Sequence, residues 1–322
     1  MLARDAESLF WTGRYLERAE DTARLLDVTY HGLLEATMAE QRVAWRGVLA
    51  AAGLDQAFGL TGRSSTAQDV AEFLVMDPDN PGSIVAAVSA ARDNVRTVRE
   101  SLSTEFWEAL NSFSLDLRGR DLQSDLESQP HDLYGFVRRN CQAVSGVAAE
   151  TLARDEGWRF LTMGWNLERA EWTCRLLRVR QVHLGDVGFH EWVGTLRAAS
   201  GIEAYRRAYR ASMEPSDVLE FLLLSPIFPR SAFFAVRVAE EALRSVDAGP
   251  EVGRALRLLG RLRAELEFAD ASDLMAGDLD GELVRMEGAI REVCSAIASQ
   301  FFVNGRDHDL HSFQVLPGEL AS

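Results

Sequence analysis

The stretch GRYLERAEDTARLLDV, residues 13–28, places glutamates and arginines where a buried helix would normally carry leucine. The stretch GWNLERAEWTCRLLRV, residues 164–179, repeats this pattern, and eleven of the sixteen positions are identical. Chance would give about one identity in a comparison of this length. The repeat at an offset of 151 residues therefore predicts an internal duplication that keeps a charged pattern.

Two further blocks recur in the same order along the chain. DVAEFLVMDPDNPGS, residues 69–83, returns as DVLEFLLLSPIFPRS, residues 217–231, with both prolines and the last serine retained. A weaker match relates residues 133–152 to residues 283–302. Because the offset is nearly constant and only two copies occur, we expect two halves that pack about a pseudo-two-fold axis rather than a solenoid.

Each half is expected to be helical. Apolar residues recur at three- and four-residue intervals, and no clean β alternation stands between turn signals. We expect an all-α helical bundle of ten to twelve helices, built from two tandem pseudo-symmetric repeats that share a core, because no Gly-rich linker separates them. The expected units are residues 1–152, a first helical repeat; residues 153–302, a second helical repeat; and residues 303–322, a polar C-terminal tail.

Periodicity and capping signals predict where the helices begin and end. The opening helix is expected over residues 5–38, and its equivalent over residues 155–183. Asp69 with Glu72 has the spacing of a capping box, which predicts that a short helix starts at Asp69. The same spacing recurs at Asp217 in the second half.

Serines and a long apolar pattern set the expected bounds of the next helix in each half. Ser83 and Ser231 each follow a proline and are predicted N-caps. In the first half one long helix is expected to run from Ser83 to about residue 113. In this interpretation Trp107 anchors the core and Asn111 is a C-cap.

The charged residues of the opening helix form a stripe beside its apolar face. At about 100° per residue, Gly13, Glu17, Glu20 and Arg24 fall within roughly 60° of one another. Arg18 lies far around the helix and is expected to belong elsewhere. If the two opening helices meet, four carboxylates and two guanidiniums converge, because the second copy repeats the stripe as Gly164, Glu168, Glu171 and Arg175, again with Arg169 on the far side.

Two interpretations of this stripe stay open at the level of sequence. Glu20 with Arg24 has the i,i+4 spacing of a helical ion pair, which favours a structural network that fixes helix register. The alternative is a ligand or catalytic site, because clustered carboxylates raise one another's pKa and arginine can clamp a carboxylate or phosphate. A metal site is not expected, since the Glu-x-x-His spacing of di-iron bundles is missing, and His308 and His311 are expected to be solvated. We also expect no cofactor.

Composition excludes several classes of partner. The balance of 34 Lys+Arg against 49 Asp+Glu gives a net charge of −15, which repels nucleic acid and anionic membrane surfaces. The start of the chain lacks the apolar region of a signal peptide, and no run approaches the ~20 apolar residues of a spanning helix. Three scattered cysteines without CxxC spacing predict a reducing, cytoplasmic environment.

Three stretches together carry a resemblance to a known family: LFWTGRYLERAEDTARLLDV, DNVRTVRESLSTEFWEALN and LERAEWTCRLL. From about residue 2 to residue 302 the chain resembles the alpha-E family of bacterial helical proteins of unknown function. Members are typically encoded beside or fused to circularly permuted ATP-grasp proteins, often with a transglutaminase-like peptidase nearby. The resemblance implies that the positions of interest are Glu17, Arg18, Glu20, Arg24, Arg99, Glu105, Trp107, Asn111, Glu168, Arg169, Glu171 and Arg175.

The second copy departs from the first beside the stripe. Trp165 and Asn166 replace Arg14 and Tyr15, and Asp21 likewise becomes a tryptophan. Any two-fold symmetry of a site is therefore expected to be imperfect.

Two functional hypotheses follow. The favoured one, which the resemblance implies, is a non-catalytic helical partner or peptide-binding component of an ATP-grasp-dependent amide ligase system. Its expected partners are the ATP-grasp ligase, a transglutaminase-like protein and a peptide or amino-acid ligand. The alternative is an enzyme or small-molecule binder that uses the Glu/Arg cluster on amino- or carboxyl-bearing substrates.

Overall fold

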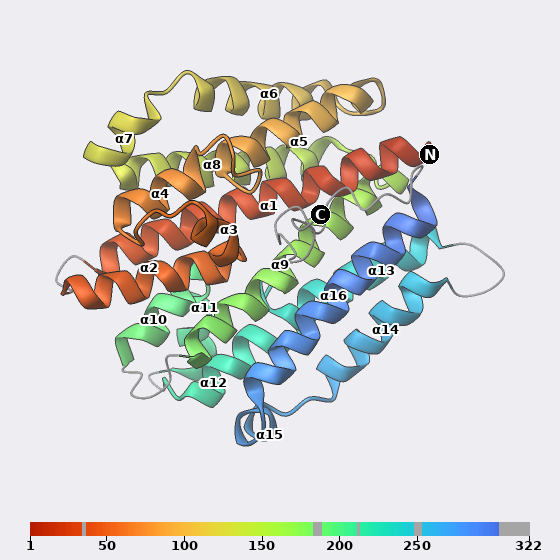
Figure 1. Cartoon of the computed structure of the whole chain (residues 1–322). Coiled ribbons are helices and arrows are strands. Elements are labelled where there is room, and N and C mark those ends of the chain that lie inside the picture. Colours follow the sequence, from red (N-terminus) through yellow and green to blue (C-terminus); the bar gives the residue numbers. More distant parts are fainter. Residues whose placement is uncertain (34–36, 183–188, 211–212, 248–252, 303–322) are drawn as a thin grey trace, which may run out of the picture.

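The regular secondary structure of the described residues is helical. The computed structural model describes residues 1–33, 37–182, 189–210, 213–247 and 253–302 (Figure 1). Every regular element in these ranges is a helix and none is a strand, which confirms the predicted all-α class. The predicted polar tail, residues 303–322, lies outside the described residues, and His308 and His311 lie outside them with it.

Sixteen α-helices, a 3-10 turn and a π-helical turn make up the described ranges, more than the ten to twelve helices predicted, because short helices occupy several connections. In chain order they are α1 (Ala3–Gly32), α2 (Met38–Ala52), α3 (Asp55–Leu60), α4 (Ala67–Val75), α5 (Ile84–Val98), η1 (Arg99–Ser101), α6 (Thr104–Arg118), α7 (Leu122–Ser128) and α8 (Pro130–Thr151). There follow α9 (Glu156–Val182), α10 (Phe189–Ala198), α11 (Ile202–Tyr209), α12 (Pro215–Leu219), η2 (Glu220–Leu224), α13 (Ala232–Val246), α14 (Arg254–Glu267), α15 (Ala271–Ala276) and α16 (Leu279–Phe301).

The two longest helices, α1 and α9, pack against each other at the centre of the molecule (Figure 1). Helices α5 and α8 pack on α1, and α6 covers both of them. Helices α13 and α16 pack on α9, and α14 covers both of those. In addition α2 packs on α9, and α10 packs on α1, so each central helix touches elements from the other part of the chain.

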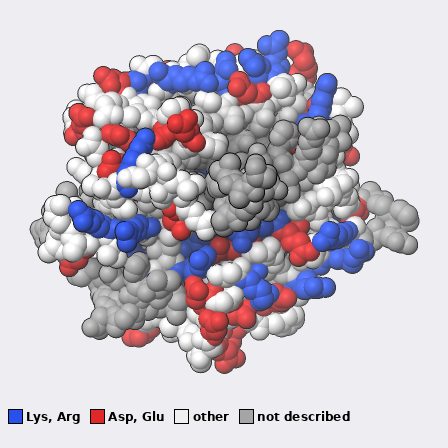
Figure 2. Space-filling model, viewed as in Figure 1, with Lys and Arg blue, Asp and Glu red and all other residues white. Residues whose placement is uncertain are grey.

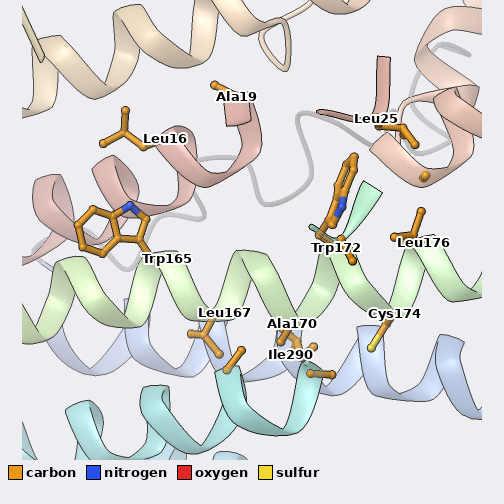
Figure 3. Packing of buried hydrophobic residues seen from close by; sticks show 14 of the residues in the cluster. Leu16, Ala19, Leu25, Trp165, Leu167, Ala170, Trp172, Cys174, Leu176 and Ile290 are labelled. Carbon is orange, nitrogen blue, oxygen red and sulfur yellow. The ribbon is translucent and has the colours of Figure 1, made fainter. Parts of the chain in front are cut away.

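Helix α9 buries two opposite faces. Figure 3 shows Trp165 and Trp172 pointing from α9 toward the α1 side, while Leu167 and Cys174 point toward α16 and α13. All four side chains are buried. A helix that is apolar on more than one side is expected at the core of a large domain, and α9 occupies that place here.

Two glycines bring the backbones of α1 and α9 into contact. A Cβ atom placed on Gly13 would overlap the carbonyl oxygen of Leu161 and lie 2.8 Å from the backbone nitrogen of Trp165. A Cβ atom placed on Gly164 would overlap the carbonyl oxygen of Phe10. Since these neighbours are backbone atoms, they cannot rotate away, and only glycine permits this crossing distance.

Several predicted helix boundaries are confirmed and others are wrong. Ser83 and Ser231 are N-caps as predicted, and their hydroxyls accept hydrogen bonds from the backbone nitrogens of Ala86 and Phe234. The short helix α4 does not start at Asp69: Thr66 is its N-cap and accepts from the Asp69 nitrogen at 3.1 Å. Asp69 is therefore the third residue of the helix, and Thr66 is its N-cap.

The corresponding prediction at Asp217 is wrong for the same reason. Helix α12 begins at Pro215, which places Asp217 in its first turn, and no side chain caps this helix. Proline suits the first helical position, because the amide proton that it lacks has no intrahelical partner there. The acidic residue lies instead near the positive end of the helix dipole.

Two expected helices are shorter than predicted. The opening helix ends at Gly32 instead of residue 38, because Thr37 and Glu40 form a capping box that starts α2. The equivalent helix α9 agrees with its prediction to within one residue at each end. In the first half, the predicted long helix is broken at Ser103, whose hydroxyl caps α6.

The predicted C-cap role of Asn111 is wrong. Asn111 lies within α6, which continues to Arg118, and its side-chain oxygen accepts a hydrogen bond from Arg92 at 2.8 Å. Trp107 is partly buried against the core, as expected of an anchor, and the Arg92 guanidinium lies 5.6 Å from its ring centre.

We expect Gly13→Ala and Gly164→Ala each to lower the free energy of unfolding by about 1–3 kcal/mol or more, because the added methyl group meets backbone that cannot give way. Chemical denaturation measures the change. The matched control is Gly146→Ala in α8, where no atom lies within 4 Å of the added carbon. That variant should be stabilised by about 0.5–1 kcal/mol through helix propensity. Equal effects at all three positions would contradict the crossing as described.

Candidate functional site

The predicted Glu/Arg stripe is buried at the interface of α1 and α9. The carboxylates of Glu17, Glu20, Glu168 and Glu171 belong to residues that are at most 5% exposed. Arg24 is 3% exposed. Burying charges costs several kcal/mol for each ion unless an opposite charge and hydrogen bonds compensate it, so the stability of the interface depends on how these groups are paired.

The two Glu-Arg dipeptides exchange partners across the interface. Arg18 donates from Nε and Nη2 to the Glu168 carboxylate, at 2.8 and 3.0 Å. Arg169 donates from Nε and Nη2 to the Glu17 carboxylate, both at 2.7 Å. Both pairs are two-pronged, a geometry that suits guanidinium and carboxylate.

The prediction that Arg18 and Arg169 belong elsewhere is therefore wrong. Their Cα positions do lie around the helix from the stripe, as the helical wheel requires. The long arginine side chain spans that separation, and the close crossing places the partner helix's glutamate within its reach. A helical wheel of α1 alone does not show which side chains of α9 lie within reach of its arginines.

Three acids and three arginines near Glu20 form one group of charges, which we call the Glu20 cluster. Its members are Glu17, Glu20, Asp21, Arg24, Arg169 and Arg230. Arg230 precedes the N-cap of α13 and bonds Asp21 at 2.6 Å, Glu20 at 2.9 Å and Glu17 at 3.1 Å. Arg24 pairs with Glu20, the i,i+4 partner that the sequence predicts. Sequence reasoning missed Arg230, for which the only signal is that PRS at residues 229–231 replaces PGS at residues 81–83.

Burial and pairing act in opposite directions on the acids of the Glu20 cluster. Burial raises the pKa of Asp21 to about 7, although Arg230 lies beside it, because Glu17 also repels its charge. Burial likewise raises the pKa of Glu17, but the guanidiniums of Arg169 and Arg230 outweigh it, and the pKa is lowered overall. Among the residues that the structure describes, none forms a hydrogen bond with the Oδ2 atom of Asp21.

A second group of charges surrounds Glu171, and we call it the Glu171 cluster: Glu168, Glu171, Arg14, Arg18 and Arg175. Arg14 donates to both glutamates at 2.7 Å and also to the sulfur of Cys294. Arg175 donates to Glu171 at 3.0 Å. Burial raises the pKa of Glu168, but Arg14 and Arg18 outweigh it and lower that pKa to about 2.

The interface thus brings together more charges than the sequence predicted. Five carboxylates and six guanidiniums occupy the two clusters, instead of four carboxylates and two guanidiniums. Each glutamate is bonded to at least two arginines. The four glutamates are therefore engaged in ion pairs, as the structural interpretation of the stripe predicts.

A cavity of about 650 Å³ lies beside the Glu171 cluster, between α1, α2, α3, α9 and α16. We call it the arginine pocket, because seven arginines line it against three carboxylates, in a chain whose net charge is −15. On the face shown in Figure 2, arginine atoms gather over α2 and along α9 and α16, among scattered acidic atoms. The charged lining residues are Arg14, Arg18, Arg46, Arg63, Arg175, Arg178, Arg291, Asp55, Glu171 and Glu287.

The end of α2 positions one of these arginines. Arg175 donates from Nε to the carbonyl oxygen of Ala51, one of the last carbonyls of α2. Gly53, which follows α2 with a φ of 73°, leaves room for the Arg175 guanidinium, whose Nη1 would lie 3.4 Å from an added Cβ. The left-handed backbone favours glycine here.

The positive charge of the pocket does not depend on pH in the physiological range. All 34 basic residues of the chain are arginine, and the sequence contains no lysine. A guanidinium stays protonated in proteins and presents donors in a planar fork that matches a carboxylate or a phosphate. The pocket therefore offers a fixed set of anion-binding donors.

One carboxylate of the pocket differs from the others. Glu287 of α16 is 2% exposed, and its nearest guanidinium atom, Nη1 of Arg178, lies 3.4 Å away. Burial raises the pKa of Glu287 despite the opposing charges of Arg175 and Arg178. Sequence reasoning missed this residue, because a single glutamate in an amphipathic helix carries no local signal.

Three residues that the resemblance singled out lie away from the two clusters. Arg99 belongs to η1 and pairs with Glu100 at 3.4 Å, with both side chains largely exposed. Glu105 is exposed in the first turn of α6. Asn111 bonds Arg92 within the pair of helices α5 and α6. The structure does not bring these three to the α1–α9 interface.

None of the described helices is long and apolar enough to cross a membrane. A comparison with protein-family models finds one that covers residues 1–302, the family Alpha-E, described as "A predicted alpha-helical domain with a conserved ER motif". The chain contains two Glu-Arg dipeptides, Glu17-Arg18 and Glu168-Arg169, and these are the pairs exchanged between α1 and α9.

The chain is also similar to curated mycobacterial proteins whose printed names give no activity. An uncharacterized protein of Mycobacterium bovis is 27% identical over 297 residues, which cover 85% of this chain and 33% of that protein. Uncharacterized proteins of two Mycobacterium tuberculosis strains are 27% and 26% identical over the same length, with the same coverage. The chain thus spans about a third of the length of these relatives. No solved structure matches it.

We expect Glu168→Gln to lower the free energy of unfolding at pH 7 by about 3–5 kcal/mol, because Arg14 and Arg18 lose a buried counter-charge. The pKa of Glu168 is about 2 in the folded chain, below its ordinary value of 4.5. Its stabilising contribution is therefore complete above pH 4.5 and is lost as the pH falls toward 2. Urea titrations at pH 7, 5 and 3.5 measure the difference in free energy of unfolding between the parent chain and the variant, which should become smaller as the pH falls.

The control for this experiment is Glu100→Gln, which removes an exposed carboxylate paired with Arg99 and should leave the stability unchanged. A Glu168→Gln variant as stable as the parent chain at pH 7 would contradict the buried exchange of partners.

Proposed function

Since the chain belongs to the Alpha-E family, whose description specifies no activity, we propose a function from its site. The chain is a non-catalytic helical component of an ATP-grasp-dependent amide ligase system, and the arginine pocket binds the carboxylate end of a peptide or amino acid. The observation that carries this proposal is the surplus of guanidinium groups around a cavity of about 650 Å³.

The size and charge of the pocket suit a small anionic ligand. Ligand sites commonly measure about 300–1,000 Å³, with a few placed polar groups that fix orientation. Arg14, Arg18 and Arg175 are held in place by glutamates and backbone, so their guanidiniums are oriented before a ligand arrives. Preorganised donors bind more tightly because less side-chain freedom is lost.

The protonation state of the charged groups near the pocket favours binding over catalysis. The Glu168 carboxylate holds Arg14 and Arg18, and its lowered pKa keeps it ionised at neutral pH. The guanidinium of arginine does not lose its proton in the physiological pH range. The arginines that Glu168 orients are therefore suited to hold an anion rather than to transfer protons.

The role as a component of a larger system rests on the family resemblance. The relatives are about three times as long as the matched region, which supports a domain that works beside other segments. We infer that an ATP-grasp ligase and a transglutaminase-like protein are its partners, that it acts in the cytoplasm, and that nucleic acid is not bound.

We also infer that residues 1–152 and residues 153–302 are pseudo-symmetric repeats. The ion pairs between Glu17 and Arg169 and between Glu168 and Arg18 support this, because the arginine of each Glu-Arg dipeptide binds the glutamate of the other. The replacement of Gly82 by Arg230 in the matched blocks then explains why the surroundings of the two clusters differ.

Glu287 supports the alternative of an enzyme acting on carboxyl-bearing substrates. A buried carboxyl group with a raised pKa at the wall of a pocket is suited to general acid–base chemistry. In a reconstituted ligase reaction, Glu287→Gln separates the two functions. Loss of turnover with unchanged ligand binding would favour the enzyme, and unchanged turnover favours the binding component.

We expect isothermal titration calorimetry to detect binding of N-acetylated trialanine with a free C-terminal carboxylate and no binding of its C-terminal amide. Arg46→Gln and Arg291→Gln should each weaken binding about tenfold or more, the effect of losing one charged hydrogen bond. Arg207→Gln on α11 makes the same charge change at an exposed position outside the pocket lining and should have no effect. Equal binding of acid and amide would overturn the proposed ligand class.

The partner role is tested separately. We expect the tagged chain, co-expressed with the ATP-grasp ligase of its host, to retain the ligase on an affinity column and to co-elute with it in size-exclusion chromatography. A tagged helical protein of similar net charge serves as the control for nonspecific retention. Separate elution of the two proteins at co-expression levels would refute the partnership and leave the ligand proposal intact.

A further inference from the structure

A histidine and aspartate cluster joins the end of α1 to the start of α8. Asp27 and His31 lie one turn apart in the last part of α1, and His131 lies in the first turn of α8. The Asp27 side chain is 8% exposed, whereas the two imidazoles are about half exposed. The cluster is separate from the arginine pocket, whose lining does not include these residues.

Nδ1 of each imidazole lies near one oxygen of the Asp27 carboxylate, and Nδ1 of His31 also lies 2.9 Å from the backbone carbonyl oxygen of Asp27, to which it donates a hydrogen bond. Nδ1 of His131 lies 2.6 Å from Oδ1 of Asp27, and Nδ1 of His31 lies 3.4 Å from that oxygen. One candidate ligand atom from each of the three residues lies within 4.8 Å of the others. The two rings meet edge to face, with their centres 4.7 Å apart.

The second oxygen of the Asp27 carboxylate forms an ion pair with Arg138. Oδ2 of Asp27 lies 3.3 Å from Nη2 of Arg138, which belongs to α8 as His131 does. Carboxylates that bind metals are commonly oriented by such an outer contact. This contact fixes Asp27 so that Oδ1 faces the two imidazoles.

We propose that Asp27, His31 and His131 form a site for a divalent transition-metal ion of the Zn²⁺ type. Zinc takes imidazole nitrogen at about 2.0–2.1 Å and carboxylate oxygen at about 2.0–2.2 Å in tetrahedral geometry. Such bonds set ligand atoms roughly 3.3–3.5 Å apart, and the His31 nitrogen already stands at that separation from Asp27. To bind the ion, Nδ1 of each imidazole gives up its proton and its hydrogen bond to Asp27, and Nδ1 of His131 moves about 1 Å away from the Asp27 carboxylate oxygen.

The composition of the set determines the kind of ion and its surroundings. Two imidazoles and one carboxylate favour zinc-like ions over calcium or magnesium, which prefer oxygen ligands. A fourth position remains for water, because both imidazoles are at the surface. The ion links α1 to α8 and therefore stabilises the folded chain, by an amount that grows with the logarithm of the ratio of the ion concentration to Kd.

This site does not follow from the spacing considered in the sequence. The expectation of no metal rested on the missing Glu-x-x-His pattern of di-iron bundles, which places all ligands of one helix at i and i+3. Here Asp27 and His31 are at i and i+4, and the third ligand comes from a helix 104 residues away. The inference does not depend on the function proposed for the arginine pocket.

Titration of the tag-free, metal-free chain with ZnSO₄ by calorimetry tests the proposal. We expect one equivalent of Zn²⁺ to bind with a micromolar or lower Kd, and His31→Ala and His131→Ala each to weaken that binding at least about tenfold. One equivalent of Zn²⁺ should raise the melting temperature of the parent chain and not that of the two variants. Cobalt(II) should give visible absorption bands of tetrahedral coordination in the parent chain only.

The control is the double variant His308→Ala/His311→Ala, which removes the other closely spaced histidines of the sequence and should keep full Zn²⁺ binding. Zn²⁺ binding that survives in both single variants, or that is lost in the double variant, would overturn the assignment. Absence of saturable binding below millimolar Zn²⁺ would also overturn it and leave the cluster as an ion-paired helix junction.

Discussion

The contact between the backbones of α1 and α9 at Gly13 and Gly164 sets the geometry on which the rest of the structure depends. With larger residues at these positions the helix axes would separate, and side chains from one helix would no longer span the gap to the other. Arg18 reaches Glu168, and Arg169 reaches Glu17, because the crossing is this close. The charged interface is thus a consequence of two positions that carry no side chain.

An interface built from charges in place of leucines has a specific physical character. Apolar side chains would pack in several registers with similar energies, whereas a two-pronged guanidinium–carboxylate pair tolerates little displacement. Desolvation cancels much of the Coulomb attraction, so the exchange contributes more to the uniqueness of the α1–α9 register than to its net stability. Arg14, Arg18 and Arg175 hold these acids and at the same time form one wall of the pocket.

Much of the helical framework could be predicted from the sequence, because it depends on local signals. The all-α class and the Ser83 and Ser231 caps follow from periodicity and capping chemistry, and the helical wheel places Glu17, Glu20 and Arg24 beside the apolar face. Arg230 could not be predicted as a partner of Asp21, since it lies 209 residues away and no local pattern links them. The pocket has residues from five helices, and its existence depends on packing that a one-dimensional pattern does not contain.

The exclusive use of arginine gives the molecule a further chemical property. Lysine would supply similar positive charge, but its amine in neutral form attacks activated carboxyl groups and forms amides. The side chains of this chain contain no primary amine, and a guanidinium is a very poor nucleophile at neutral pH. A protein of this composition has no lysine side chain that an activated carboxyl group could acylate in place of another amine.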